Sequence, residues 1–130
     1  MSVALFPSAT AAEHEREIGA RLAQTDAAFF VAERGDGTVC GFVEVGTRPY
    51  VDGCDSSPVG YVEAWFVEPE MRRGGVGRAL LGAAEEWARA LGLSEIASDT
   101  QLVNETSRRA HLRSGYAEVD RIIQFRKALK

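Results

Sequence analysis

A cluster of glycines and arginines at residues 72–78, Arg-Arg-Gly-Gly-Val-Gly-Arg, constrains the fold of this chain more than any other feature. The segment before it, Tyr61–Val67, is rich in β-branched and aromatic residues and stops at Glu68-Pro69, which is typical of a strand. The segment after it carries an apolar stripe at helical spacing, and Gly92 can end the helix; the stripe comprises Val76, Leu80, Ala84, Trp87, Ala88 and Leu91. The sequence therefore predicts a strand, a glycine turn and an amphipathic helix in direct succession.

The segments before this unit predict a helix, a hairpin and a loop. Thr10 and Glu13 have the spacing of a capping box, which marks the beginning of a helix. The turn sequence Arg34-Gly35-Asp36-Gly37 lies between two β-rich segments, which should pair as antiparallel strands. The expected elements are a helix over residues 11–23, strands at Phe29–Glu33 and Thr38–Val45, and a long irregular loop at Thr47–Pro58.

The segments after the central helix predict three further elements. They are a short strand at Ser94–Ser98, a helix from Asn104 to about Ser114 that Gly115 ends, and a last strand at Tyr116–Phe125. The resulting order is α-β-β-β-α-β-α-β, and a length of 130 residues suits a single domain over 1–130. The expected class is α/β, a mixed sheet with flanking helices.

Composition narrows the range of partners. Fifteen Lys+Arg against 19 Asp+Glu give a net charge of −4, which disfavours a nucleic-acid binder and favours a cationic partner. Two cysteines, Cys40 and Cys54, lack metal-ligand spacing and suit free thiols in the cytoplasm, so no metal is expected. No signal peptide or membrane-spanning stretch is evident, and we expect neither secretion nor a membrane partner.

Glycines directly before a helix suit an anion site, because the first helical turn has unpaired N–H groups and the positive end of the dipole. A P-loop would need Lys and Ser or Thr after Gly77, where Arg78 and Ala79 stand. A dinucleotide site would need a small residue at Leu80. Of the three cofactor classes that could use such a site, this leaves a pantetheine pyrophosphate such as that of coenzyme A. The alternative is that the glycines form a turn that binds no anion and that the arginines are solvated.

The motif Arg72-x-x-Gly75-x-Gly77 resembles the acyl-CoA-binding signature of the GCN5-related N-acetyltransferase (GNAT) superfamily. The order of elements from Asn104 to Gly115 is also similar to that superfamily. Residues 50–59, Glu63 and the Ala-Ser-Asp-Thr sequence at 97–100 resemble the chromosomal subgroup of aminoglycoside 6′-N-acetyltransferases. The resemblance implies the GNAT fold, acetyl-CoA as co-substrate, a cationic aminoglycoside as acceptor and a role in antibiotic resistance.

The same resemblance implies a set of residues around the acetyl-CoA. It places Trp65, Phe66 and Val67 beside the pantetheine and the acetyl group, and Asn104 on the pantetheine arm. His111 stands where many members have a tyrosine that protonates the departing thiolate; the alternative is a packing or surface histidine. The residues expected around the pyrophosphate are Arg72, Arg73, Gly74, Gly75, Val76, Gly77 and Arg78.

The resemblance also implies an acidic substrate site. Acetyl transfer needs an amine that has lost its proton, so carboxylates can both attract the ammonium and accept that proton. Asp99 is the expected proton acceptor; the alternative is an aspartate that caps a loop. Glu63 is an expected ligand of the substrate; the alternative is an exposed strand position or a structural salt bridge. Strand alternation predicts that Glu63 shares a face with Tyr61, Trp65 and Val67. The expected substrate contacts are Phe6, Tyr50, Glu63, Asp99 and Asp120, the last also explicable as a surface residue.

Two features differ from the superfamily pattern. We expect the usual first strand and most of the first helix to lack a counterpart before Leu5-Phe6-Pro7, which would leave a sheet edge open and suggests a homodimer. The alternative acceptor is another amine: a polyamine, a small metabolite or a protein amino group. A shortened, non-catalytic relative that binds acyl-CoA or an aminoglycoside is a further alternative, whereas nucleic-acid binding through Arg72, Arg73 and Arg78 is disfavoured by neighbouring glutamates.

Overall fold

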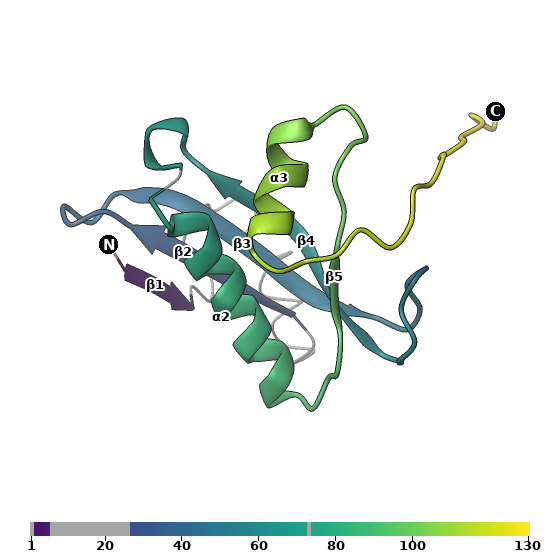
Figure 1. The fold of residues 1–130 in the computed structure, drawn as a ribbon, viewed down its shortest axis with the longest axis horizontal. Coiled ribbons are helices and arrows are strands. Elements are labelled where there is room, and N and C mark those ends of the chain that lie inside the picture. Colours follow the sequence, from purple (N-terminus) through teal and green to yellow (C-terminus); the bar gives the residue numbers. More distant parts are fainter. Residues whose placement is uncertain (1, 6–26, 73) are drawn as a thin grey trace.

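A five-stranded mixed sheet forms the centre of the computed structural model, which describes residues 2–5, 27–72 and 74–130. The strands lie in sequence order, and the first four pair antiparallel, whereas the last joins its neighbour in parallel (Figure 1). They are β1 (Ser2–Leu5), β2 (Ala27–Glu33), β3 (Val39–Arg48), β4 (Val59–Val67) and β5 (Ile96–Ser98).

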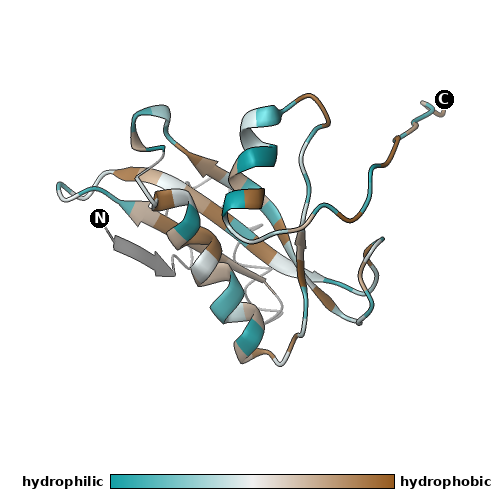
Figure 2. Ribbon diagram, viewed as in Figure 1, coloured by the Kyte–Doolittle hydropathy of each residue, from teal (hydrophilic) through white to brown (hydrophobic). Residues whose placement is uncertain are grey.

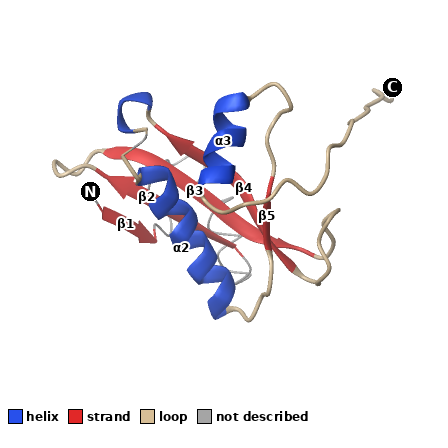
Figure 3. Ribbon diagram, viewed as in Figure 1, coloured by secondary structure: helices blue, strands red, loops and turns tan. Residues whose placement is uncertain are grey.

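Two α-helices and one short 3-10 helix complete the described structure. The 3-10 helix η1 (Pro69–Met71) follows β4, and α2 (Val76–Ala90) then carries the chain across the sheet to β5, as a parallel pair of strands requires (Figure 3). Helix α3 (Glu105–Arg113) packs on the same side, where Arg78 of α2 donates a hydrogen bond to the carbonyl of Arg113.

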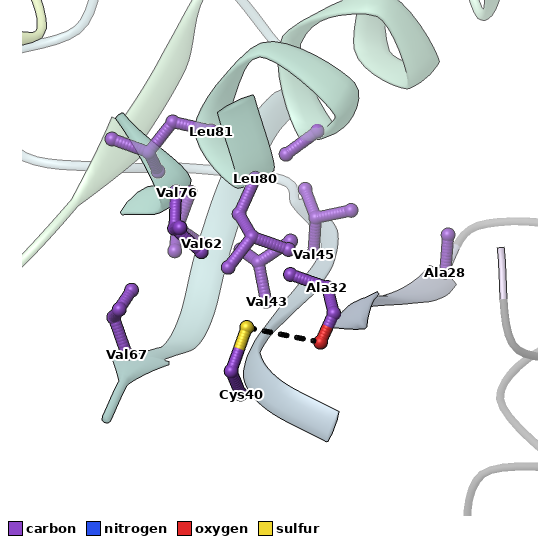
Figure 4. Packing of buried hydrophobic residues seen from close by; sticks show 11 residues of the cluster. Ala28, Ala32, Cys40, Val43, Val45, Val62, Val67, Val76, Leu80 and Leu81 are labelled. Atoms are coloured by element: carbon purple, nitrogen blue, oxygen red, sulfur yellow. Dashed lines mark hydrogen bonds between the residues drawn. The ribbon is translucent and has the colours of Figure 1, made fainter. Parts of the chain in front are cut away.

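The hydrophobic core lies between α2 and the sheet. Leu80, Leu81 and Ala84 of α2 are fully buried against small and β-branched side chains of β2, β3 and β4. The thiol of Cys40 lies in this core, 3.5 Å from the carbonyl oxygen of Ala32 (Figure 4). Figure 2 shows hydrophilic and hydrophobic residues mixed along α2, as expected for an amphipathic helix.

Most of the elements predicted from the sequence are confirmed. The hairpin is β2 and β3, the strand and helix around the glycine cluster are β4 and α2, and Asn104 caps α3 by accepting a hydrogen bond from the amide of Ser107 at 3.0 Å. Strand β5 is three residues long, shorter than predicted. The helix expected over residues 11–23 lies outside the described residues.

Two expectations about the ends of the sheet are wrong. Ser2–Leu5 pairs with Phe30–Glu33, so the edge that we expected to be open carries a strand. The last strand expected at Tyr116–Phe125 does not form: Tyr116 packs against the core, and the chain after it runs past β5 and then out from the body to the C-terminus (Figure 1). A strand needs a partner for its backbone groups, and in the described part of the chain this segment has none, leaving its apolar side chains exposed: Val119, Ile122, Ile123 and Phe125 are 60%, 65%, 80% and 91% exposed.

A β-bulge in β4 corrects a third expectation. Glu44 pairs with Ala64 and Val45 with Val62, so Glu63 is an extra residue on β4. The bulge interrupts the alternation of side chains: Val62, Trp65 and Val67 pack toward the core below α2, whereas Tyr61 and Glu63 contact Arg48 instead. The predicted shared face of Glu63 with Trp65 and Val67 is therefore wrong.

Candidate active site

The strands β4 and β5 separate after a short stretch of parallel pairing. They pair from Gly60 with Ile96 to Val62 with Ser98, and β4 then continues to Val67 paired with β3 among the described residues. Backbone groups of β4 on the side of β5 are therefore open to a ligand beyond this fork. A cavity of about 720 Å³ adjoins β5, and its lining includes Tyr50, Tyr61, Ser98, Asp99, His111 and Asp120.

Four charged or polar side chains form a continuous network on one side of the fork. The guanidinium of Arg48 binds Glu63 through two hydrogen bonds, Nη2 to Oε1 at 2.8 Å and Nε to Oε2 at 3.1 Å. It also lies 3.6 Å above the centre of the Tyr61 ring. The hydroxyl of Tyr61 donates a hydrogen bond to Oδ2 of Asp99 at 2.5 Å. Two carboxylates that the sequence predicted are thus linked through Arg48 and Tyr61.

The protonation states in this network follow from its contacts. Burial, together with the hydrogen bond to Asp99, raises the pKa of Tyr61. The hydrogen bonds to Glu63 raise the pKa of Arg48. Tyr61 therefore stays a neutral donor to Asp99 at ordinary pH, and Glu63 already has a cation beside it. The remaining oxygen of Asp99 can accept a proton or an ammonium group.

The loop between β3 and β4 is held by one carboxylate at the beginning of the β5 segment. Oε1 of Glu95 accepts hydrogen bonds from the amides of Asp55 and Ser56, at 2.9 and 2.7 Å, and from the hydroxyl of Ser56 at 2.5 Å. The Ser56 hydroxyl and amide lower the pKa of Glu95 more than partial desolvation raises it. The same loop carries Tyr50, whose hydroxyl donates to Asp52 at 2.9 Å.

The glycine cluster shapes the beginning of α2. Gly75 precedes the helix with a φ of 86°, a conformation that favours glycine, and no side chain in the described residues caps this helix. The first amides of α2 are therefore available to an anion. At Gly77 a Cβ atom would lie 3.0 Å from the Trp65 ring, whose Nε1 donates to the Gly77 carbonyl at 3.2 Å.

The arginines of the cluster are partly engaged with the protein backbone. Nε of Arg72 donates to the carbonyl of Val67 at 3.0 Å, and Arg78 donates to the carbonyl of Arg113. A guanidinium has five N–H groups, so each retains donors for a phosphate. Arg73 lies outside the described residues.

His111 lies on the other side of the fork from Asp99, within α3. Its Nδ1 is 2.8 Å from the carbonyl oxygen of Ser107, and its Nε2 is 2.8 Å from Oγ of Ser98. The rings of Trp65 and Tyr116 pack edge-on against the imidazole, with centroids at 4.9 and 5.8 Å. Burial, followed by the hydrogen bond to Glu85, raises the pKa of Tyr116.

The other residues predicted for the site are distributed as follows. Asp120 lines the cavity with Tyr50, but lies on the extended segment instead of a strand. Phe66 is 43% exposed and its ring packs on Phe42 at 5.9 Å. The side chain of Asn104 caps α3. Phe6 lies outside the described residues.

Sequence reasoning missed four residues of the site, namely Arg48, Tyr61, Glu95 and Ser98. Each makes its contact through pairing between segments far apart in the chain, such as Tyr61 with Asp99, and no local pattern encodes that pairing. Among the described residues, no group of three or more His, Cys, Asp or Glu side chains is arranged for a metal ion. None of the described helices has the length and apolar character needed to cross a bilayer.

Comparison with known proteins identifies close relatives. A model of the acetyltransferase (GNAT) family matches residues 3–116. Aminoglycoside N(6′)-acetyltransferase type 1 of Klebsiella aerogenes is 46% identical over 132 aligned positions, which cover 99% of this chain and 87% of the relative. The enzyme of the same name from Serratia marcescens is 38% identical, with 99% and 89% covered.

Solved structures give the same result. The structure of AAC(6′)-Iy in complex with the bisubstrate analog CoA-S-monomethyl-acetylneamine has a TM-score of 0.86 at 31% identity, and 98% of each chain is covered. The apo structure of AAC(6′)-IG from Acinetobacter haemolyticus has a TM-score of 0.85 at 29% identity, with 100% of each chain covered.

The contacts of Glu95 predict that its charge holds the loop at residues 49–58. In Glu95→Gln the amides of Asp55 and Ser56 should exchange with solvent several-fold faster, because a neutral acceptor replaces a carboxylate. Hydrogen exchange followed by NMR, expressed as protection factors, measures this. The same loss should occur in the wild type as the pH falls through the lowered pKa of Glu95, since the contacts require the ionised form.

The matched control is Glu86→Gln, which removes an exposed carboxylate that pairs with Arg89 on α2. It should leave the protection of Asp55 and Ser56 unchanged. Equal protection in Glu95→Gln and the wild type would contradict the role of Glu95.

Proposed function

Because this chain belongs to the acetyltransferase (GNAT) family, we propose that it transfers the acetyl group of acetyl-CoA to the 6′-amino group of aminoglycosides. The observation that carries this proposal is the 46% identity, over 99% of the chain, to an aminoglycoside N(6′)-acetyltransferase. The acidic network at the fork of β4 and β5 supports it, because this network can receive a polycationic acceptor beside an acyl-CoA site. We take residues 1–130 as one N-acetyltransferase domain.

The acetyl-CoA site is proposed along the fork and the glycine cluster. The pyrophosphate would bind the first amides of α2, with Gly74, Gly75, Val76 and Gly77 supplying a close backbone approach and Arg72, Arg73 and Arg78 supplying charge. The pantetheine would lie along the open backbone of Trp65, Phe66 and Val67, as an added strand does. Asn104, at the beginning of α3, is the proposed contact to its amide groups.

The acceptor amine is proposed to bind at Asp99 and Glu63, with Tyr50 and Asp120 contacting the rest of the aminoglycoside and Phe6 a further contact. An ammonium group near carboxylates is easily bound but harder to deprotonate, because the negative charges raise the pKa of the amine. Asp99 resolves this conflict, since it can accept the proton directly or through water. The substrate cation also replaces part of the interaction between Glu63 and Arg48.

The first experiment is an assay of thiol release from acetyl-CoA with a panel of amines. Kanamycin and tobramycin should support turnover, whereas an aminoglycoside with a 6′-hydroxyl group should not, because it lacks the reacting nitrogen. Turnover with spermidine alone would instead indicate a polyamine acetyltransferase. Stabilisation by acetyl-CoA without turnover of any amine would indicate a non-catalytic binding protein and would refute the proposal.

The role of Asp99 predicts a separation between catalysis and cofactor binding. Asp99→Asn should lower kcat by about 100-fold or more, because the amide keeps the hydrogen bond to Tyr61 but accepts no proton. The Kd for acetyl-CoA, measured by calorimetry, should stay within about threefold of wild type. Asp36→Asn, in the distant turn before β3, is the control. Near wild-type turnover in Asp99→Asn would exclude this residue as the proton acceptor.

We also propose that the protein is a cytoplasmic homodimer. Cys40 and Cys54 are free thiols, which suits a reducing compartment. Residues 116–130 expose apolar side chains, and β5 has an open edge in the described part of the chain; a second subunit can cover both. Light scattering should give twice the mass of 14.1 kDa. A monomer at micromolar concentration would refute the dimer.

A further inference from the structure

The contacts of His111 fix the direction of a short chain of hydrogen bonds. The shortest contact of Nδ1 of His111 is to the carbonyl oxygen of Ser107, at 2.8 Å; this oxygen can only accept, so Nδ1 carries a proton, and the Ser107 hydroxyl lies farther away, at 3.4 Å. In the neutral imidazole Nε2 is then the unprotonated nitrogen, and the hydroxyl of Ser98 donates to it at 2.8 Å. A hydroxyl that donates to an oriented imidazole is the arrangement by which a serine passes its proton on.

The position of Ser98 brings this hydroxyl to the fork. Ser98 is the last residue of β5 and pairs with Val62, the last paired residue of β4 before the two strands separate. Its side chain contacts His111 of α3, whereas the next residue, Asp99, contacts Tyr61 on the other side. Ser98 and Asp99 therefore lie at the point where β4 and β5 separate, with their side chains on opposite sides of it. Both line the same cavity as His111.

The imidazole is held in one orientation. Trp65 and Tyr116 pack edge-on against it at interplanar angles of 78° and 84°, and the Ser107 carbonyl holds Nδ1. His111 therefore presents Nε2 to Oγ of Ser98, at 2.8 Å.

We propose that the Ser98 hydroxyl carries a proton from the attacking nitrogen to the departing sulfur, with His111 holding the proton between the two steps. This inference rests on the proposed acetyl transfer, in which Asp99 takes the first proton from the ammonium group. Ser98 then accepts the second proton, which the nitrogen loses as the N–C bond forms. The nitrogen and the sulfur are attached to the same tetrahedral carbon, so one hydroxyl can reach both in turn.

The step balances without any further reagent. As the N–C bond forms, the nitrogen gives a proton to Oγ of Ser98, while the proton of Oγ passes to Nε2 of His111. As the C–S bond breaks, its electron pair stays on sulfur; Nε2 returns the proton to Oγ, and the proton of Oγ passes to sulfur. The products are the amide and the thiol, and Ser98 and His111 regain their starting states.

NMR of the free protein tests the direction of the hydrogen bonds. The ¹⁵N shifts of His111 at pH 8, assigned with His111→Gln, should show a proton on Nδ1 and an unprotonated Nε2. Ser98→Ala should change the Nε2 shift, because its donor is lost. A proton on Nε2 would overturn the proposal, since Ser98 would then have to accept.

Kinetics test the relay itself. Ser98→Ala should lower kcat about 100-fold, while KM for the aminoglycoside and Kd for acetyl-CoA stay within about threefold. Ser98→Thr, which keeps a hydroxyl, should recover most of the activity, and this rescue would not follow from a packing role. Thr38→Ala removes an exposed hydroxyl in the turn between β2 and β3, away from the cavity, and should leave kcat unchanged. Thermal unfolding checks that every variant is folded.

The outcomes separate this inference from the proposed function. An active wild type together with a Ser98→Ala variant of similar kcat overturns the relay and leaves the proposed acetyl transfer standing. Ser98→Thr as inactive as Ser98→Ala, in a folded protein, also overturns it. A wild type that acetylates no aminoglycoside removes both.

Discussion

The separation of β4 from β5 is the constraint on which the rest of this structure depends. Three parallel residue pairs join the two strands, and β4 then continues for five residues with β3 as its described neighbour. Unpaired backbone groups are stable where solvent or a ligand can reach them, so the fork is both a gap in the sheet and a place for a partner. The bulge at Glu63 begins where pairing with β5 ends, and it turns Trp65 toward the helices.

Helix α2 allows the fork to remain open. Its buried face, centred on Leu80 and Leu81, packs on the regular part of the sheet, so the stability of the fold does not require β4 and β5 to pair along their length. The unpaired amides in the first turn of α2 are therefore available to bind a ligand. Gly77 lets the Trp65 ring approach this turn, and the same ring contacts His111. One side chain thus connects the beginning of α2, the fork and α3.

The sequence predicts most of the order of elements, because this order depends on local patterns, whereas the candidate site residues were implied by the family resemblance. Capping at Asn104, the apolar stripe of α2 and the glycines before it are all encoded within a few residues. The bulge at Glu63 was not predictable, since it depends on the register with β3, and neither was the unpaired segment after Tyr116. Arg48 and Ser98 were missed for the same reason: their partners are 15 and 13 residues away, on neighbouring elements.

The fixed spacing of residues along β5 limits how this segment can change in evolution. Three residues separate the loop anchor at Glu95 from Asp99, and Ser98 and Asp99 contact opposite sides of the fork. A strand alternates its side chains, so a shift of one position would exchange the hydroxyl and the carboxylate between the two sides. Insertions and deletions should therefore be absent from residues 95–99 of functional relatives, even where single substitutions are accepted. Length variation should instead accumulate in exposed turns, such as residues 34–37 between β2 and β3.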